Sequence, residues 1–200
     1  SARTFEHLSA LAQTHLEPDL AQRWISMLRP AVWLRHAQPG EPVVARLGGT
    51  PVLPDGVTWP IWEGKGPLGF VGEIDLAALD ASTCSPGLTL PREGRFAMFY
   101  FCNEDQPDAM VVADEPHTLQ GARLLHLPGA VPAHEARVEL TAVQVQTWPG
   151  EEHPASQLNG LDELPDAFTD ALLELLEADL GDAVGHQVGG WALPVQGPVE

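Results

Sequence analysis

Short segments rich in β-forming residues follow one another through the middle of the chain, and turn residues rather than helices separate them. Parallel strands need a crossover connection of a dozen or more residues, usually a helix, whereas antiparallel strands need only a tight turn. The pattern therefore predicts an antiparallel sheet. The expected strands cover residues 31–36, 43–47, 68–76, 94–102, 109–113, 122–127 and 136–146.

Two of these strands indicate how the sheet is shaped. Residues 96–101 are apolar on both faces, which is typical of a central strand that is buried on both sides. In the last expected strand, Val138 and Leu140 share one phase of the alternation. Val143 and Val145 share the other phase, so we expect a bulge or a bend between the two pairs. A curved, roll-like sheet follows.

Both ends of the chain show helical spacing instead. Residues 4–16 and 18–28 read as two helices, and Pro18 suits the first turn of the second because its fixed φ is already helical. A third, amphipathic helix is expected within residues 160–181. Its inward-facing residues are Phe168, Leu172, Leu175 and Leu176.

These elements predict one α+β domain over residues 1–200, mainly antiparallel β, with a helical segment at 1–30, a β-rich core at 31–146 and a C-terminal helix. No apolar run reaches the roughly 18 residues of a membrane span, and the N-terminus lacks the order of a signal peptide. Cys84 and Cys102 are too few for a disulfide framework. We therefore expect a cytoplasmic protein with free thiols and no membrane partner.

The whole chain has a formal net charge of −18, and most of this negative charge lies in its second half. Residues 1–100 carry ten acidic and eight basic side chains, whereas residues 101–200 carry eighteen acidic and two basic ones. Such a field repels phosphate backbones and anionic lipid, so nucleic-acid and membrane-surface binding are not expected. It would attract a basic protein.

Part of this charge forms a stripe on the expected C-terminal helix. Its members are Asp166, Asp170, Glu174 and Glu177, at i, i+4, i+8 and i+11, with no Lys or Arg within reach on the helix. Like charges at i, i+4 destabilise an isolated helix by a few tenths of a kcal/mol, which a basic partner would relieve. The stripe is therefore a candidate partner-binding surface. The alternative is a solvated acidic face that aids solubility.

Two segments, residues 47–75 and 185–196, combine Gly and Pro with aromatic and polar side chains. Glycine permits backbone angles that other residues avoid and proline fixes φ, so such clusters specify rigid loops. Indole rings could wall a small-ligand pocket there, and polar groups could orient its ligand. Alternatively, the polar groups bind the backbone of neighbouring loops. The candidate ligand-binding residues are Trp59, His186, Gln187 and Trp191.

Glu73 and Asp75 are the candidate catalytic residues. Side-chain alternation along strand 68–76 places Phe70 and Ile74 on the core face and both carboxylates on the other face. Their separation would be about 7 Å, within the range of the paired carboxylates of inverting glycoside hydrolases. The alternatives are acids on a solvent-exposed face, or Asp75 capping a short helix that follows.

Cofactor and metal signals are weak in this chain. The sequence GKGPLG at residues 64–69 has the letters of a dinucleotide fingerprint, but Pro67 and a strand follow where a helix must begin. The histidines show no spacing that would supply three metal ligands. We therefore expect no cofactor and no metal, and the sequence favours a protein without enzymatic activity.

Four segments resemble successive motifs of the YwqG-like family of bacterial proteins: LGGTPVLPDGVTWP, GPLGFVGEIDL, LPREGRFAMFYF and GHQVGGWALPVQ. The resemblance covers most of residues 31–196 and implies a mainly antiparallel β roll with flanking helices. The family's function is unknown. Some relatives lie near toxin and immunity genes, which hints at protein binding.

The chain departs from that family pattern in two places. Glu73 stands where family members usually have glutamine. Family members also continue past the last motif with further strand-rich sequence, so we expect this chain to lack the C-terminal portion of the family domain. The sequence as a whole favours a non-catalytic module that binds a basic protein, such as an immunity or inhibitor protein. The alternative is a hydrolase or small-ligand-binding protein that uses Trp59, Glu73, Asp75, His186 and Gln187.

Overall fold

A computed structural model describes residues 3–103, 105–106, 109–112, 115–129, 136–161, 163–180 and 186–192. The chain divides into two compact units that alternate along the sequence. The first unit comprises Ser1–Arg35, Cys84–Thr89 and Val143–Glu200, and the second unit comprises His36–Thr83 and Leu90–Ala142. Each unit is built from segments far apart in the sequence.

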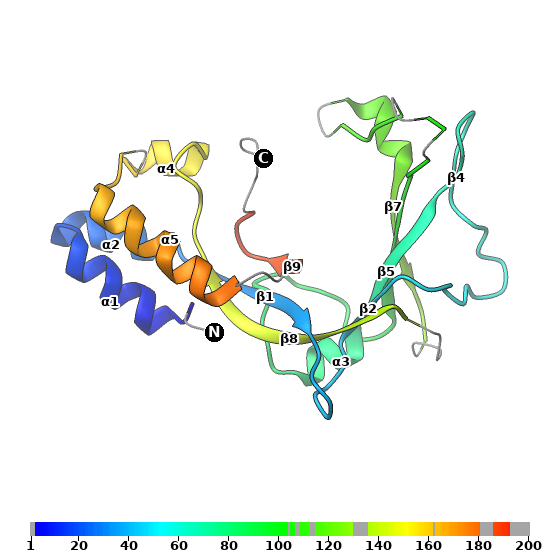
Figure 1. Cartoon of the computed structure of the whole chain (residues 1–200), viewed down its shortest axis with the longest axis horizontal. Coiled ribbons are helices and arrows are strands. Elements are labelled where there is room, and N and C mark those ends of the chain that lie inside the picture. Colours follow the sequence, from blue (N-terminus) through cyan, green and yellow to red (C-terminus); the bar gives the residue numbers. More distant parts are fainter. Residues whose placement is uncertain are drawn as a thin grey trace. The chain divides into compact units, whose positions relative to one another are not determined.

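The strands pair into a seven-stranded sheet in the order β7-β6-β5-β2-β8-β1-β9, and β8 passes from the second unit into the first (Figure 1). Every pairing of known register in this sheet is antiparallel, which confirms the α+β class with an antiparallel, roll-like sheet. The strands are β1 (Arg29–His36), β2 (Ala45–Leu47), β5 (Gly69–Asp75), β6 (Arg95–Tyr100), β7 (Ala122–Leu127), β8 (Val138–Thr147) and β9 (His186–Gly189).

The helices of the first unit are α1 (Phe5–His15), α2 (Pro18–Ser26), α4 (Pro154–Leu158) and α5 (Asp166–Leu180). Thr4 caps α1 by accepting a hydrogen bond from the His7 amide, and Pro18 occupies the first turn of α2 as the sequence predicts. The N-terminal helices are therefore confirmed within two residues of their expected ends, and the C-terminal helix is confirmed inside its expected range, beginning at Asp166. Helix α4 is an addition that the sequence pattern did not indicate.

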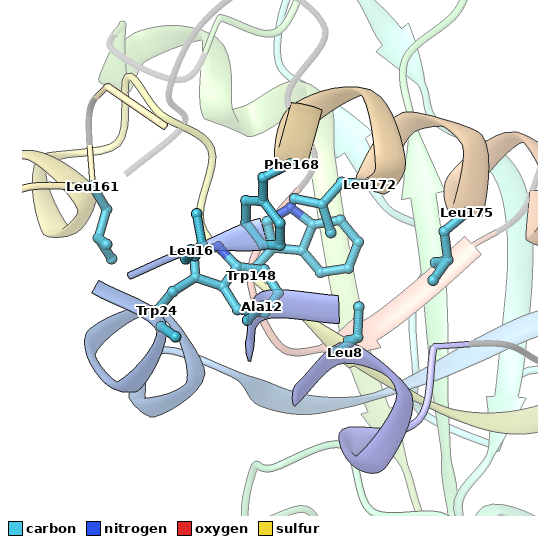
Figure 2. Packing of buried hydrophobic residues seen from close by; sticks show 10 residues of the cluster. Leu8, Ala12, Leu16, Trp24, Trp148, Leu161, Phe168, Leu172 and Leu175 are labelled. Atoms are coloured by element: carbon cyan, nitrogen blue, oxygen red, sulfur yellow. The ribbon is translucent and has the colours of Figure 1, made fainter. Parts of the chain in front are cut away.

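Apolar side chains from α1, α2 and α5 converge on one core in the first unit (Figure 2). Trp24 is its centre, because its ring meets Phe168 edge to face at 5.0 Å and lies 5.9 Å from Trp148. Such aromatic pairs add about 0.5–1.5 kcal/mol beyond their buried area. This packing fixes the face that α5 buries, and hence the face that it exposes. The buried residues of α5 are Phe168, Leu172 and Leu175.

The second unit contains β2, β5, β6, β7 and the first part of β8, with α3 (Leu76–Ala81), the 3-10 helix η1 (Pro116–Gly121) and the two-stranded sheet of β3 (Ile61–Trp62) and β4 (Gly66–Pro67). Strand β6 lies between β5 and β7, as expected of a central strand. Only one of its faces is fully buried, however. Ala97 and Phe99 are buried, whereas Met98 is partly exposed and Tyr100 is exposed.

The expected strand at 109–113 is wrong for its described residues, 109–112. A side chain occupies the backbone groups that a neighbouring strand would need. The Thr118 hydroxyl accepts a hydrogen bond from the Val112 amide at 2.8 Å and lies 2.9 Å from the Val112 carbonyl oxygen. Such local bonds between side chain and backbone compete with sheet ladders, so this segment forms a loop.

Strand β5 contains an irregularity between Phe70 and Gly72 that changes the faces of its side chains. Phe70 pairs with Phe99, but Glu73 pairs with Ala97, so an extra residue separates the two pairs on β5. A one-residue shift moves each following side chain to the opposite face of the sheet. The prediction that Glu73 lies on the face opposite Phe70 is therefore wrong, because Glu73 lies on the same face as Phe70 and the buried Ala97.

Candidate functional site

Glu73 is a buried carboxylate that pairs with Arg95 on the adjacent strand β6. The Arg95 Nε and the Glu73 Oε2 are 3.2 Å apart, and each side chain is 2% exposed. Arg95 also donates a hydrogen bond from Nη2 to the carbonyl oxygen of Val52. These contacts make Glu73 a charge partner of Arg95 inside the second unit, and a catalytic role for Glu73 stays a prediction.

Asp75 has a different structural partner. Its Oδ1 accepts a hydrogen bond from the Ala78 amide at 3.0 Å, and Asp75 is the N-cap of α3. This is the capping arrangement that the sequence offered as an alternative. An aspartate at this position satisfies one of the amides that the first turn of a helix leaves without a partner.

The capping role of Asp75 can be tested by measuring the stability of two variants. We expect Asp75→Ala to lower the free energy of unfolding by about 1 kcal/mol, because the Ala78 amide loses its acceptor. Asp75→Asn should keep most of the stability, since asparagine caps helices as well as aspartate does. Urea denaturation of both variants measures the difference. Equal losses in the two variants would show that the charge, and not the cap, matters.

Trp59 serves the core of the second unit. Its Nε1 donates a hydrogen bond to the Leu68 carbonyl oxygen at 2.7 Å, and its ring meets Phe99 edge to face at 5.2 Å. The residue is nevertheless 38% exposed. Trp59 therefore anchors the loop before β3, and part of its ring faces solvent.

The other candidate ligand-binding residues belong to the first unit, where residues 186–192 of the second Gly- and Pro-rich segment are described and residues 185 and 193–196 lie outside the description. Trp191 is 3% exposed, and its Nε1 donates to the Met27 carbonyl oxygen at 2.6 Å. The Arg29 guanidinium lies over its ring at 3.5 Å, and the His153 ring meets it at 4.9 Å. Trp191 is thus enclosed by protein.

Gln187 holds the turn that follows β9. Its Nε2 donates to the carbonyl oxygens of Gly189 at 2.9 Å and Trp191 at 2.8 Å, as in the loop-bonding alternative. Its Oε1 is buried and has no hydrogen-bond partner among the described residues. His186, at the start of β9, is exposed and pairs with Leu34 of β1. The ligand-binding role of these residues stays a prediction.

The acidic stripe on α5 is exposed along its whole length. Asp166, Asp170, Glu174 and Glu177 all face solvent, on the helix whose opposite side packs in the core. None of the four forms an ion pair within the described part of the chain, and the last turn of α5 contains no basic residue. Asp179 differs, because it is mostly buried and its Oδ2 lies 2.6 Å from Arg3 Nε.

A groove of about 630 Å³ lies between α1 and α5 and includes part of this stripe. The two helices run side by side in the first unit (Figure 1). From α5, the groove takes Asp170 and Glu174. On the α1 side, His7 and His15 line the groove. The centre of the His15 ring lies 6.4 Å from the centre of the Phe168 ring. Its apolar lining consists of Leu11, Ala167, Ala171, Leu175 and Ala178.

The α1 side of this groove was missed by the sequence analysis. His7, Leu11 and His15 recur at i, i+4 and i+8, which places them on one helix face. That spacing was available in the sequence. What the sequence could not show is that this face lies beside α5, because the two helices are about 150 residues apart in the chain.

Three further features bear on the kind of site. Within the described ranges, no three or more His, Cys, Asp or Glu side chains are grouped so that they could hold a metal ion. The described helices include none with the length and apolar character needed to cross a membrane. Cys84 and Cys102 are free thiols.

Comparison with known proteins identifies one family. A family model described as a domain of unknown function, DUF1963, matches residues 45–200. No curated protein matches the chain.

Proposed function

The chain belongs to the DUF1963 family, whose domain has no assigned function, and we propose that it is a non-catalytic, cytoplasmic binding protein for a basic protein partner. The acidic stripe of α5, Asp166, Asp170, Glu174 and Glu177, is the proposed contact surface. The observation that supports the proposal most is that these four exposed carboxylates have no cationic partner in the described chain. Two of them, Asp170 and Glu174, also line a groove that is otherwise mainly apolar on its α5 side.

The charge distribution supports a basic partner. Complementary potentials steer two proteins together and fix their orientation, and mutating exposed charges changes the association rate and its salt dependence. The apolar lining of the groove lies next to these charges. A partner that covered this lining would remove apolar surface from water, which favours binding. Charge would thus set the orientation, and the groove would supply the buried area.

The motifs and the acidic surface also support a more specific family and role. We propose that the protein is YwqG-like and bacterial, and that it acts as an immunity or inhibitor protein towards its basic partner. The support is the motif resemblance together with the acidic surface of α5. The hydrolase alternative lacks comparable support, because both of its carboxylates have structural partners, Arg95 for Glu73 and the α3 amide for Asp75.

The surface can be tested with a variant that neutralises all four carboxylates: Asp166→Asn, Asp170→Asn, Glu174→Gln and Glu177→Gln. The probe is a lysine-rich peptide whose binding is followed by calorimetry. Exposed charge pairs contribute roughly 0.2–1 kcal/mol each, so four of them correspond to a loss of about fourfold to several hundredfold in affinity. Binding by the unmodified protein should also weaken as salt is added.

A matched control keeps the same change in net charge elsewhere. It neutralises two Asp and two Glu that are exposed in the second unit: Asp55→Asn, Glu63→Gln, Glu93→Gln and Asp105→Asn. We expect this control to lose no more than about threefold in affinity, since only long-range potential changes. Equal losses in both variants would mean that the peptide senses total charge and that α5 is not the contact surface.

A further inference from the structure

The groove between α1 and α5 allows the class of partner segment to be named, and this inference rests on the proposed function. We propose that the groove binds an amphipathic α-helix of the partner, with apolar residues inward and Lys or Arg beside the acidic wall. The groove belongs to the first unit alone, and its lining residues are all described.

The α5 wall is built for close approach of a helix. Ala167, Ala171 and Ala178 lie at i, i+4 and i+11 on one face, and they are three of the six α5 residues that line the groove. Small side chains allow two helix axes to approach more closely than large ones do, since the interaxial distance depends on the side chains at the contact. Leu175 and Leu11 supply the larger apolar surface between them.

The dimensions fit a short helix. Eleven residues separate Ala167 from Ala178 on α5, and eight separate His7 from His15 on α1. At 1.5 Å per residue these spans are about 16 Å and 12 Å, which corresponds to two to three helical turns. A helix of this length presents residues i, i+3, i+4 and i+7 to a groove, as in other helix-in-groove complexes.

The walls of the groove differ in charge, which orients the occupant. Asp170 and Glu174 are one turn apart on the α5 side, whereas the α1 side contributes the rings of His7 and His15. A basic residue of the partner therefore fits next to α5 and not next to α1. Two Lys or Arg one turn apart on the partner helix would pair with the two carboxylates at once.

Two peptides of about 16 residues and identical Lys, Leu and Ala composition test this inference. One has leucines at helical spacing with lysines on a flank, and the other is a scrambled sequence that cannot form an amphipathic helix. The patterned peptide should bind at least tenfold more tightly than the scrambled one. Circular dichroism should show that only the patterned peptide gains helix when it is mixed with the protein.

A groove variant, Ala171→Gln with Ala178→Gln, shows whether the preference depends on this groove. Glutamine leaves the net charge unchanged and is also a good helix former, but it adds polar bulk to the apolar lining. We expect the tenfold preference to fall to within about twofold. A control with Ala10→Gln and Ala77→Gln, two exposed helical alanines outside the groove lining, should retain it.

The outcomes separate this inference from the proposed function. If both peptides bind equally and both respond to neutralisation of α5, the acidic surface stands and the helix-binding inference is overturned. An unchanged preference in the groove variant also overturns it. If neither peptide binds, or neither responds to neutralisation of α5, the proposed function itself fails.

Discussion

Replacing Glu73 by alanine should lower the free energy of unfolding by about 3–5 kcal/mol. The change leaves the Arg95 guanidinium buried without its carboxylate, and removing one partner of a buried ion pair has an effect of this size. Urea denaturation followed by tryptophan fluorescence measures it, since Trp59 and Trp62 lie in the same unit and their rings contact Phe99 and Phe101.

A double variant separates the ion pair from simple loss of packing. Glu73→Leu combined with Arg95→Met removes both charges and keeps similar volumes, so we expect most of the stability to return. Replacing a buried pair by apolar residues of similar volume is often neutral or stabilising. Two results would contradict this account of the pair. One is an unfolding midpoint for Glu73→Ala that equals that of the wild type, and the other is a double variant that is less stable than Glu73→Ala.

Gly189→Ala should destabilise the first unit by about 2–5 kcal/mol. Gly189 has φ +76°, and a Cβ built on it would overlap the carbonyl oxygen of Pro86. A left-handed conformation contributes roughly 1–2 kcal/mol for a residue with a side chain, and overpacking contributes roughly another 1–3 kcal/mol. The expected result is an earlier thermal unfolding transition with loss of the β1–β9 pairing.

Gly160→Ala is the control for the backbone strain alone. Gly160 lies in the same unit with φ +63°, and its added Cβ would approach only the end of the flexible Arg23 side chain, at 3.1 Å. The free energy of unfolding of Gly160→Ala should therefore fall by only about 1–2 kcal/mol. If the two variants unfold at the same temperature, the close approach of Pro86 does not limit position 189.

The helices and the acidic stripe were predictable because both depend on local spacing. The apolar residues of α5 recur every three or four positions, and this periodicity alone places Asp170 and Glu174 on the opposite, exposed side. The antiparallel sheet was predictable for a similar reason, since the absence of helices between most strands leaves few other topologies. Position within an element is what such reasoning predicts well.

The faces of β5 were not predictable by the same reasoning. Alternation put Glu73 on the face opposite Phe70, but the irregularity between Phe70 and Gly72 inserts one residue and moves every later side chain to the other face. Gly72, directly after Val71, is the only letter there that hints at the insertion, because an isolated glycine within a strand often marks a bulge. The inserted residue places Glu73 on the same face as Arg95. The ion pair between them could therefore be identified only from the strand register.

The groove was unpredictable for a different reason, because it depends on which helices are neighbours. Each of its walls has a readable periodicity, in α1 and in α5. Their contact depends on the packing of Trp24 against Phe168 and on the rest of the core between the helices. Such contacts between distant segments are set by tertiary packing and not by local preference.

The alternation of the two units along the chain has a consequence for biosynthesis. When α1 and α2 leave the ribosome, the α5 residues that will cover their apolar faces have not yet been made. About 150 residues separate α1 from α5, which corresponds to roughly 8–30 s at typical translation rates. During that interval the apolar faces of α1 and α2 lack the cover that α5 supplies later, whereas the segment from His36 to Ala142 already contains the whole of the second unit.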